Sequence, residues 1–130
     1  MADSAAEIVR SGYDAFAKGD IPSVLAIFAD DIAWTIGGRS PLAGTYTGHD
    51  EVLGFFGKLQ ELSGGTFHLD IEQIFDNGAD TAVVLATEKA EREGRQLDEF
   101  QIHLWRLDGG KTTSFQAFPA DDYVVDEFWS

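Results

Sequence analysis

The chain has 130 residues, of which 44% are hydrophobic, with 23 acidic against 9 basic side chains and no cysteine. This length fits one domain over residues 1–130, and the formal charge of −14 argues against nucleic acid and anionic membranes as partners. Disulfides and thiol chemistry are excluded. Since the sequence shows neither a secretory leader nor an apolar run long enough to span a membrane, we expect a cytoplasmic protein.

Three amphipathic helices are predicted in the first half of the chain. A capping box at residues 4–7 opens the first, whose apolar stripe is Ile8, Val9, Gly12, Ala15 and Phe16. Gly19 suits the end of this helix, and Asp20 with Pro22 begins a short second one. The third carries apolar side chains at helical spacing and ends at residues 63–65; they are Val52, Phe55, Phe56, Leu59 and Leu62.

The remaining segments are predicted as strands and turns. Ile32, Trp34 and Ile36 alternate with other residues and indicate a short strand. A glycine- and threonine-rich stretch follows it. After residue 65, turn signals at 76–78, 93–94 and 108–110 separate four apolar-rich runs. Helices followed by a meander of four strands predict an α+β fold.

The turns give an approximate register for the last three strands. A two-residue loop at 93–94 and a three-residue loop at 108–110 would pair Val84 with His103, Ala86 with Gln101, Phe115 with His103, and Ala117 with Gln101. One face then carries Ala82, Val84, Ala86, Glu88, Gln101, His103, Trp105, Phe115 and Ala117. The other face carries Val83, Leu85, Phe100, Ile102, Leu104 and Phe118.

These two faces predict a pocket and a dimer. The alanines of the first face leave space under the helices, and an apolar cavity with a few polar groups is typical of a small-molecule site. The residues expected to line it are Tyr13, Phe16, Trp34, Phe55, Phe56, Trp105, Phe115 and Ala117, although any of the aromatic ones could be ordinary core. Three helices cover only one face well, so the second, outer face predicts a homodimer.

Four polar residues are candidates for chemistry. His103 is a candidate proton carrier because imidazole titrates near neutrality, and Gln101 could hold a carbonyl or enolate oxygen. Glu88 could be a base if buried, and Asp122 could lie at the pocket rim. Each also has a purely structural alternative. The other two histidines lack metal-ligand spacing, and no phosphate loop or triad is visible, so neither a metal nor a cofactor is predicted.

Four segments carry a family resemblance in chain order: residues 13–20 with 28–34, residues 44–52, residues 103–111, and the acidic residues 121–129. Together they resemble the SnoaL-like and ketosteroid-isomerase-like members of the NTF2-like superfamily, and the last resembles one uncharacterised branch of it. The resemblance implies a cone in which N-terminal helices pack on a curved mixed or antiparallel sheet around a pocket, often as a dimer. Its enzymes include isomerases, cyclases, dehydratases and epoxide hydrolases, and several members are not enzymes.

The catalytic residues of those enzymes are mostly absent here. Ketosteroid isomerases resemble this chain around residues 28–34, but their carboxylate base would fall in residues 34–36, which contain no acid. Ile102 stands at the position of their oxyanion-hole aspartate. SnoaL-type cyclases resemble it at Gln101-x-His103, yet their aspartate on the final strand falls near Ala117. The ketosteroid isomerase mechanism is therefore not expected.

Three functions remain open from the sequence. The leading hypothesis is cofactor-free acid/base chemistry on a small apolar carbonyl compound, by isomerisation, cyclisation or dehydration. His103 would move the proton, Gln101 would hold the oxygen, and Asp122 or Glu88 would be the carboxylate. The alternatives are a non-catalytic pocket for an apolar ligand and a dimeric scaffold with a vestigial pocket. The missing aspartates favour these two.

Overall fold

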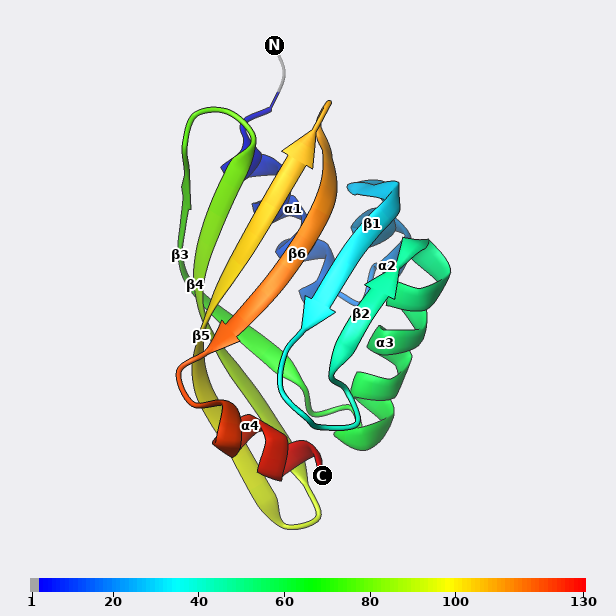
Figure 1. Cartoon of the computed structure of the whole chain (residues 1–130), viewed down its shortest axis with the longest axis vertical. Coiled ribbons are helices and arrows are strands. Elements are labelled where there is room, and N and C mark those ends of the chain that lie inside the picture. The colour runs from blue at the N-terminus through cyan, green and yellow to red at the C-terminus, as the bar shows by residue number, and fades with distance from the viewer. Residues whose placement is uncertain (1–2) are drawn as a thin grey trace.

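The computed structural model describes residues 3–130, and all three predicted helices are present (Figure 1). Helix α1 (Ala5–Ala17) begins with the expected capping box, in which the Ser4 hydroxyl accepts the Glu7 N–H and the Glu7 carboxylate accepts the Ser4 N–H. Helix α2 (Ile21–Ala26) begins at Asp20, whose carboxylate accepts the N–H of Ser23. Helix α3 spans Gly48–Leu62.

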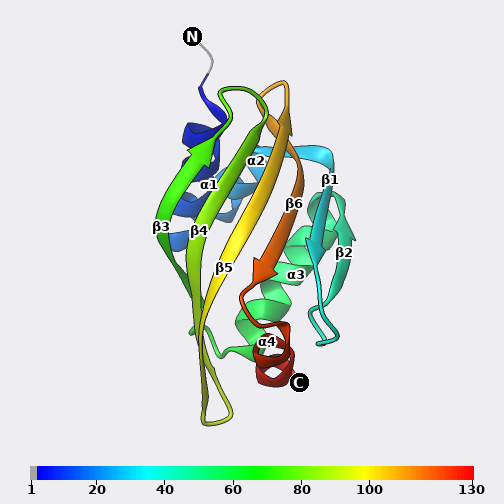
Figure 2. The same ribbon diagram turned by 60° about the vertical axis from the view of Figure 1, so that its left-hand side comes forward.

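Six strands form one mixed sheet in the order β2-β1-β6-β5-β4-β3. The strands are β1 (Phe28–Ile36), β2 (Gly44–Thr47), β3 (His68–Asp76), β4 (Thr81–Arg92), β5 (Arg95–Asp108) and β6 (Lys111–Pro119). Neighbours run antiparallel except β1 and β6, whose parallel pairing sets Trp34 beside Phe115. Helices α1 to α3 lie on one side of this curved sheet (Figure 2). The α+β prediction is confirmed.

Two elements were missed by the sequence analysis. Strand β2 lies in the glycine- and threonine-rich stretch, and helix α4 (Asp122–Trp129) lies in the acidic C-terminal segment. The Asp121 carboxylate caps α4 by accepting the N–H groups of Tyr123 and Val124. The buried side chains of α4, Val125, Phe128 and Trp129, follow helical spacing, but the helix has only eight residues and the pattern is short.

The β4–β5 register agrees with the prediction. Arg92 lies opposite Arg95, and Ala86 lies opposite Gln101. The loop between these strands consists of Glu93 at φ 52° and Gly94 at φ 77°. Two consecutive left-handed residues are typical of the two-residue hairpin turn whose twist matches that of its strands.

The predicted β5–β6 register is wrong by two residues. His103 lies opposite Ala117 rather than Phe115, and Gln101 lies opposite Pro119 rather than Ala117. The loop has two residues, since Asp108 pairs with Lys111, and a bulge at Arg106/Leu107 adds one residue to β6. Each difference moves the pairing by one residue. Their sum is even beyond the bulge, so the predicted faces of Phe115, Ala117 and Phe118 are still correct.

The helices cover the inner face of the sheet and leave the outer face exposed. The inner side chains Ala82, Val84 and Ala86 are fully buried beneath the helices. On the outer face, large apolar side chains remain exposed: Phe75, Phe100, Ile102 and Phe118. No helix among residues 3–130 is both long and apolar enough to cross a membrane.

Candidate functional site

A cavity of about 90 Å³ lies between the helices and the inner face of the sheet. Its walls are largely aromatic. All eight residues expected around a pocket line it, namely Tyr13, Phe16, Trp34, Phe55, Phe56, Trp105, Phe115 and Ala117. Among the lining residues that the sequence analysis did not name as such are Phe28, Phe67, Val125 and Trp129. Val125 and Trp129 had a usable signal, because they are spaced by four residues behind a capping aspartate.

The aromatic wall is closely packed at its centre. The rings of Trp34 and Phe115 stack with their centroids 3.7 Å apart, and Trp105 meets both of them edge-on. Such pairs contribute about 0.5–1.5 kcal/mol beyond the area that they bury. The parallel β1–β6 pairing is what brings Trp34 and Phe115 together.

A chain of hydrogen bonds crosses the inner face of the sheet along one side of the cavity. The Trp105 indole N–H donates to the Tyr13 hydroxyl over 2.9 Å, and that hydroxyl lies 2.5 Å from Nδ1 of His103. Nε2 of His103 lies 2.9 Å from Oε1 of Gln101, and the Gln101 amide N–H donates to the carboxyl of Glu88. The predicted trio Glu88, Gln101 and His103 is thus contiguous, and Tyr13 joins it from α1.

The pKa values along this chain are shifted mainly by burial. Burial raises the pKa of Glu88 to about 7, a hydrogen bond from the Trp129 indole opposes this, and the nearby charge of Glu99 adds to it. Burial lowers the pKa of His103 to about 3 and raises that of Tyr13 well above its usual value. Of these three groups, Glu88 alone changes charge near neutral pH.

The buried carboxyl predicts a pH-dependent difference in stability between the wild type and Glu88→Gln. Folding raises the pKa of Glu88 from 4.5 to about 7, so this carboxyl contributes stability that is fully present below pH 4.5 and lost as pH rises through 7. The difference in free energy of unfolding between the two proteins should shift by about 3 kcal/mol across this window, at about 1.4 kcal/mol per pH unit. Urea unfolding at several pH values measures it.

A difference that stays constant with pH would contradict a buried, titrating Glu88. Taking a difference matters because His103, held neutral by burial, gives a stability slope of opposite sign that both proteins share. Glu91→Gln is the matched control on the same strand. Its side chain is exposed, so its difference from the wild type should stay flat.

Helix α4 closes one side of the cavity. Val125 and Trp129 face the cavity, and Trp129 is almost fully buried. Asp122, the remaining candidate carboxylate, begins this helix and also borders the cavity, but its side chain is exposed. Among residues 3–130, no hydrogen bond joins it to the chain that ends at Glu88. The structure therefore groups three of the four chemical candidates and sets Asp122 apart at the rim.

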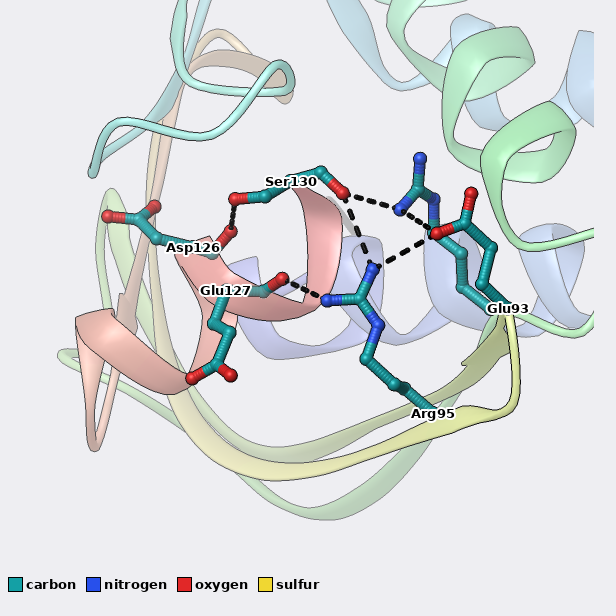
Figure 3. Close-up of polar contacts among 6 residues, drawn as sticks. Glu93, Arg95, Asp126, Glu127 and Ser130 are labelled. Atoms are coloured by element: carbon teal, nitrogen blue, oxygen red, sulfur yellow. Dashed lines mark hydrogen bonds and ion pairs between the residues drawn. The ribbon is translucent and has the colours of Figure 1, made fainter.

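Two arginines beside the β4–β5 turn hold α4 in place (Figure 3). Arg95 donates to the backbone oxygen of Glu127, and Arg92 donates to that of Ser130, each over 2.6 Å. From the other side, the Asp126 carboxylate accepts the backbone N–H groups of residues 39 and 40. A carboxylate that accepts N–H groups makes stronger hydrogen bonds than a neutral acceptor.

The sequence and the structure of this chain are similar to those of known proteins. Residues 9–115 match the SnoaL-like domain. An uncharacterized protein of Mycobacterium tuberculosis is 29% identical over 128 residues, which cover 98% of each chain. Bal32a, from a soil-derived mobile gene cassette, is 31% identical with a TM-score of 0.91, over 96% of this chain and 95% of that one. A cystatin-like protein of unknown function from Xanthomonas campestris is 27% identical with a TM-score of 0.89, over 95% and 96%.

Two more distant structures share the fold and contain ligands. TerC, co-crystallized with polyporic acid, is 24% identical with a TM-score of 0.83, over 94% of this chain and 95% of that one. A Mycobacterium tuberculosis protein in complex with estradiol-17β-hemisuccinate is 19% identical with a TM-score of 0.75, over 88% and 93%.

Proposed function

The chain belongs to the SnoaL-like family and has the NTF2-like fold, and from this premise we propose that it binds a small apolar carbonyl compound and moves a proton on it without a cofactor. The reaction would be an isomerisation, cyclisation or dehydration. One observation carries the proposal: a carboxyl whose pKa burial raises to about 7, that of Glu88, lines an aromatic cavity. Perturbed carboxyls in clefts are typical of acid/base sites.

Glu88 is the proton carrier that this geometry supports. A group with a pKa near the working pH can both accept and return a proton, which typically accelerates a reaction 10²–10⁴-fold. His103, which the sequence favoured, has its pKa lowered by burial to about 3, so charging it inside the cavity is costly. We therefore assign His103 and Gln101 the role of orienting Glu88 through their hydrogen bonds.

The ligand class follows from the walls. The cavity offers aromatic rings and few polar groups, so it favours a compact apolar skeleton with one oxygen function. TerC with polyporic acid and the mycobacterial protein with the estradiol derivative support this, since both pair a ring system carrying oxygen with the same fold.

Hydrogen–deuterium exchange on a model ketone tests the proposal. Cyclohexanone would be incubated with the protein in D₂O, and loss of its α-proton signal would be followed by NMR. A base in the cavity accelerates this exchange above the buffer rate. Binding of cyclohexanone and other small ketones without accelerated exchange would favour the non-catalytic pocket. Failure of any of them to bind would favour the scaffold.

We also propose that a second copy of the chain covers the outer face of the sheet. Phe100, Ile102 and Phe118 lie on neighbouring strands and are 38–45% exposed, and contiguous apolar surface of this kind marks interfaces. The wild type is expected to scatter light as a dimer at micromolar concentration, and Phe118→Asp as a monomer. Leu53→Asp, on the exposed side of α3, is the matched control and should stay dimeric. A monomeric wild type would contradict the proposal.

A further inference from the structure

The hydrogen-bond chain from Trp105 to Glu88 has a direction, and we infer that the charge on Glu88 sets it. When the carboxyl is ionised, the Tyr13 O–H donates its hydrogen bond to His103. When the carboxyl is protonated, the Tyr13 O–H can instead donate to a ligand oxygen in the cavity. This inference rests on the proposed function, because it assumes that the cavity is a ligand site. It adds a ligand-binding role for Tyr13 and a coupling between the two ends of the chain.

The direction with Glu88 ionised follows from what each group can donate. Ionised Glu88 can only accept, so the Gln101 amide N–H donates to it and Oε1 of Gln101 faces His103. Neutral His103 therefore carries its proton on Nε2 and donates it to Oε1 of Gln101, and its bare Nδ1 accepts the Tyr13 O–H. The Trp105 indole N–H, which only donates, fills one acceptor site of the Tyr13 oxygen. The Tyr13 O–H therefore donates to His103 and cannot donate to a ligand in the cavity.

Protonation of Glu88 reverses this order. A buried O–H needs an acceptor, and leaving it without one costs about 1–3 kcal/mol. The Trp129 indole, whose hydrogen bond lowers the pKa of Glu88, can only donate. The acceptor is therefore Oε1 of Gln101, which faces Glu88 once the amide turns over.

The reversal then continues to Tyr13. The turned Gln101 amide presents its N–H to Nε2 of His103, so that nitrogen must be bare and the proton moves to Nδ1. Nδ1–H donates to the Tyr13 oxygen, which already accepts from Trp105. Both acceptor sites of that oxygen are then filled. Its own O–H can therefore donate a hydrogen bond into the cavity that Tyr13 lines. The change needs an amide turn, a tautomer shift and a hydroxyl rotation, with no movement of the backbone.

The surroundings of Glu88 allow both its protonated and its ionised form near neutral pH. Glu99 on β5 and burial raise the pKa of Glu88 to about 7. From α4, Asp122 and Asp126 border the cavity, while β3 contributes the apolar Leu69. The other titratable members of the hydrogen-bond chain are His103 on β5, which burial keeps neutral, and Tyr13 on α1, which burial keeps protonated. None of the described residues that line the cavity is a lysine or arginine.

The coupling gives proton abstraction a second component. When Glu88 takes a proton from the α-carbon, the C–H bond breaks, an O–H bond forms on Glu88, and the electron pair moves to the carbonyl oxygen. The same protonation releases the Tyr13 hydroxyl toward this enolate oxygen. A donor that becomes available as the charge develops stabilises the transition state more than the bound ketone.

Ligand binding as a function of pH tests the coupling. A ketone that needs the Tyr13 donor binds the protonated form, so the dissociation constant of cyclohexanone should rise about tenfold from pH 6 to pH 8. Methylenecyclohexane has the same shape without the oxygen, and its affinity should not change. Tyr13→Phe should remove the pH dependence for the ketone.

Glu88→Gln provides the matched variant. The Trp129 indole N–H holds the new amide oxygen, so the amide N–H faces Gln101 and imitates the protonated carboxyl. This variant should bind cyclohexanone at pH 8 as tightly as the wild type does at pH 6. The ¹⁵N NMR signals of His103 should show the Nε2–H tautomer in the wild type at pH 8 and the Nδ1–H tautomer in the variant.

Two results would overturn the inference: the same His103 tautomer in both proteins, or cyclohexanone binding that does not depend on pH in the wild type. Failure of both cyclohexanone and methylenecyclohexane to bind would instead count against the proposed function. In that case the NMR measurement still decides whether Glu88 sets the direction of the chain, because it requires no ligand.

Discussion

Glu88→Gln is expected to lower the rate of α-proton exchange on bound cyclohexanone by a factor of about 10²–10⁴, the usual contribution of a positioned acid or base. The amide has nearly the volume of the carboxyl and keeps a hydrogen bond to Gln101. It cannot take a proton from carbon. The cavity therefore stays filled and polar in the same place, and the loss should fall on kcat rather than on KM.

The control for this experiment is the other carboxylate at the cavity. Asp122 borders the cavity from α4 but is exposed and stands apart from the hydrogen-bond chain. Asp122→Asn should leave the exchange rate close to that of the wild type, since no hydrogen bond among residues 3–130 joins Asp122 to Glu88, Gln101 or His103. If instead Asp122→Asn abolished exchange and Glu88→Gln kept it, the base would be Asp122.

Trp34→Ala is expected to lower the free energy of unfolding by about 3–5 kcal/mol, as for other buried Trp and Phe residues. The indole is 7% exposed, stacks on Phe115 and meets Phe56 and Trp105 edge-on. Its removal leaves a void in the wall that joins β1 to β6. Urea unfolding followed by circular dichroism measures the loss.

Trp34→Phe is the informative partner of this variant. The Trp34 indole N–H is buried without a hydrogen-bond partner among the described residues, and an unmet buried donor costs about 1–3 kcal/mol. Phenylalanine removes that donor and keeps a stacked ring, so its loss should be below about 1.5 kcal/mol. Equal losses in the two variants would mean that the indole N–H has an acceptor in solution, for example a buried water.

The elements defined by local signals were predictable. The capping box at residues 4–7 and the apolar spacing of α3 depend on neighbours within one or two turns, where side chains act directly on the backbone. The two-residue loop at 93–94 likewise set the β4–β5 register, and with it the common face of Glu88, Gln101 and His103. Helix α4 was missed although Val125, Phe128 and Trp129 follow helical spacing, because the helix has only eight residues.

The sequence by itself determined which polar side chains share the inner face, because alternation along a strand is a local property of the backbone. It did not determine their chemistry. Only the tertiary structure placed Tyr13 against His103 and closed the cavity with Trp129 on α4. That burial raises the pKa of Glu88 and lowers that of His103, since desolvation penalises whichever form is charged. The proposed proton carrier thus changes from the histidine to the carboxyl, because desolvation depends on elements far apart in the chain.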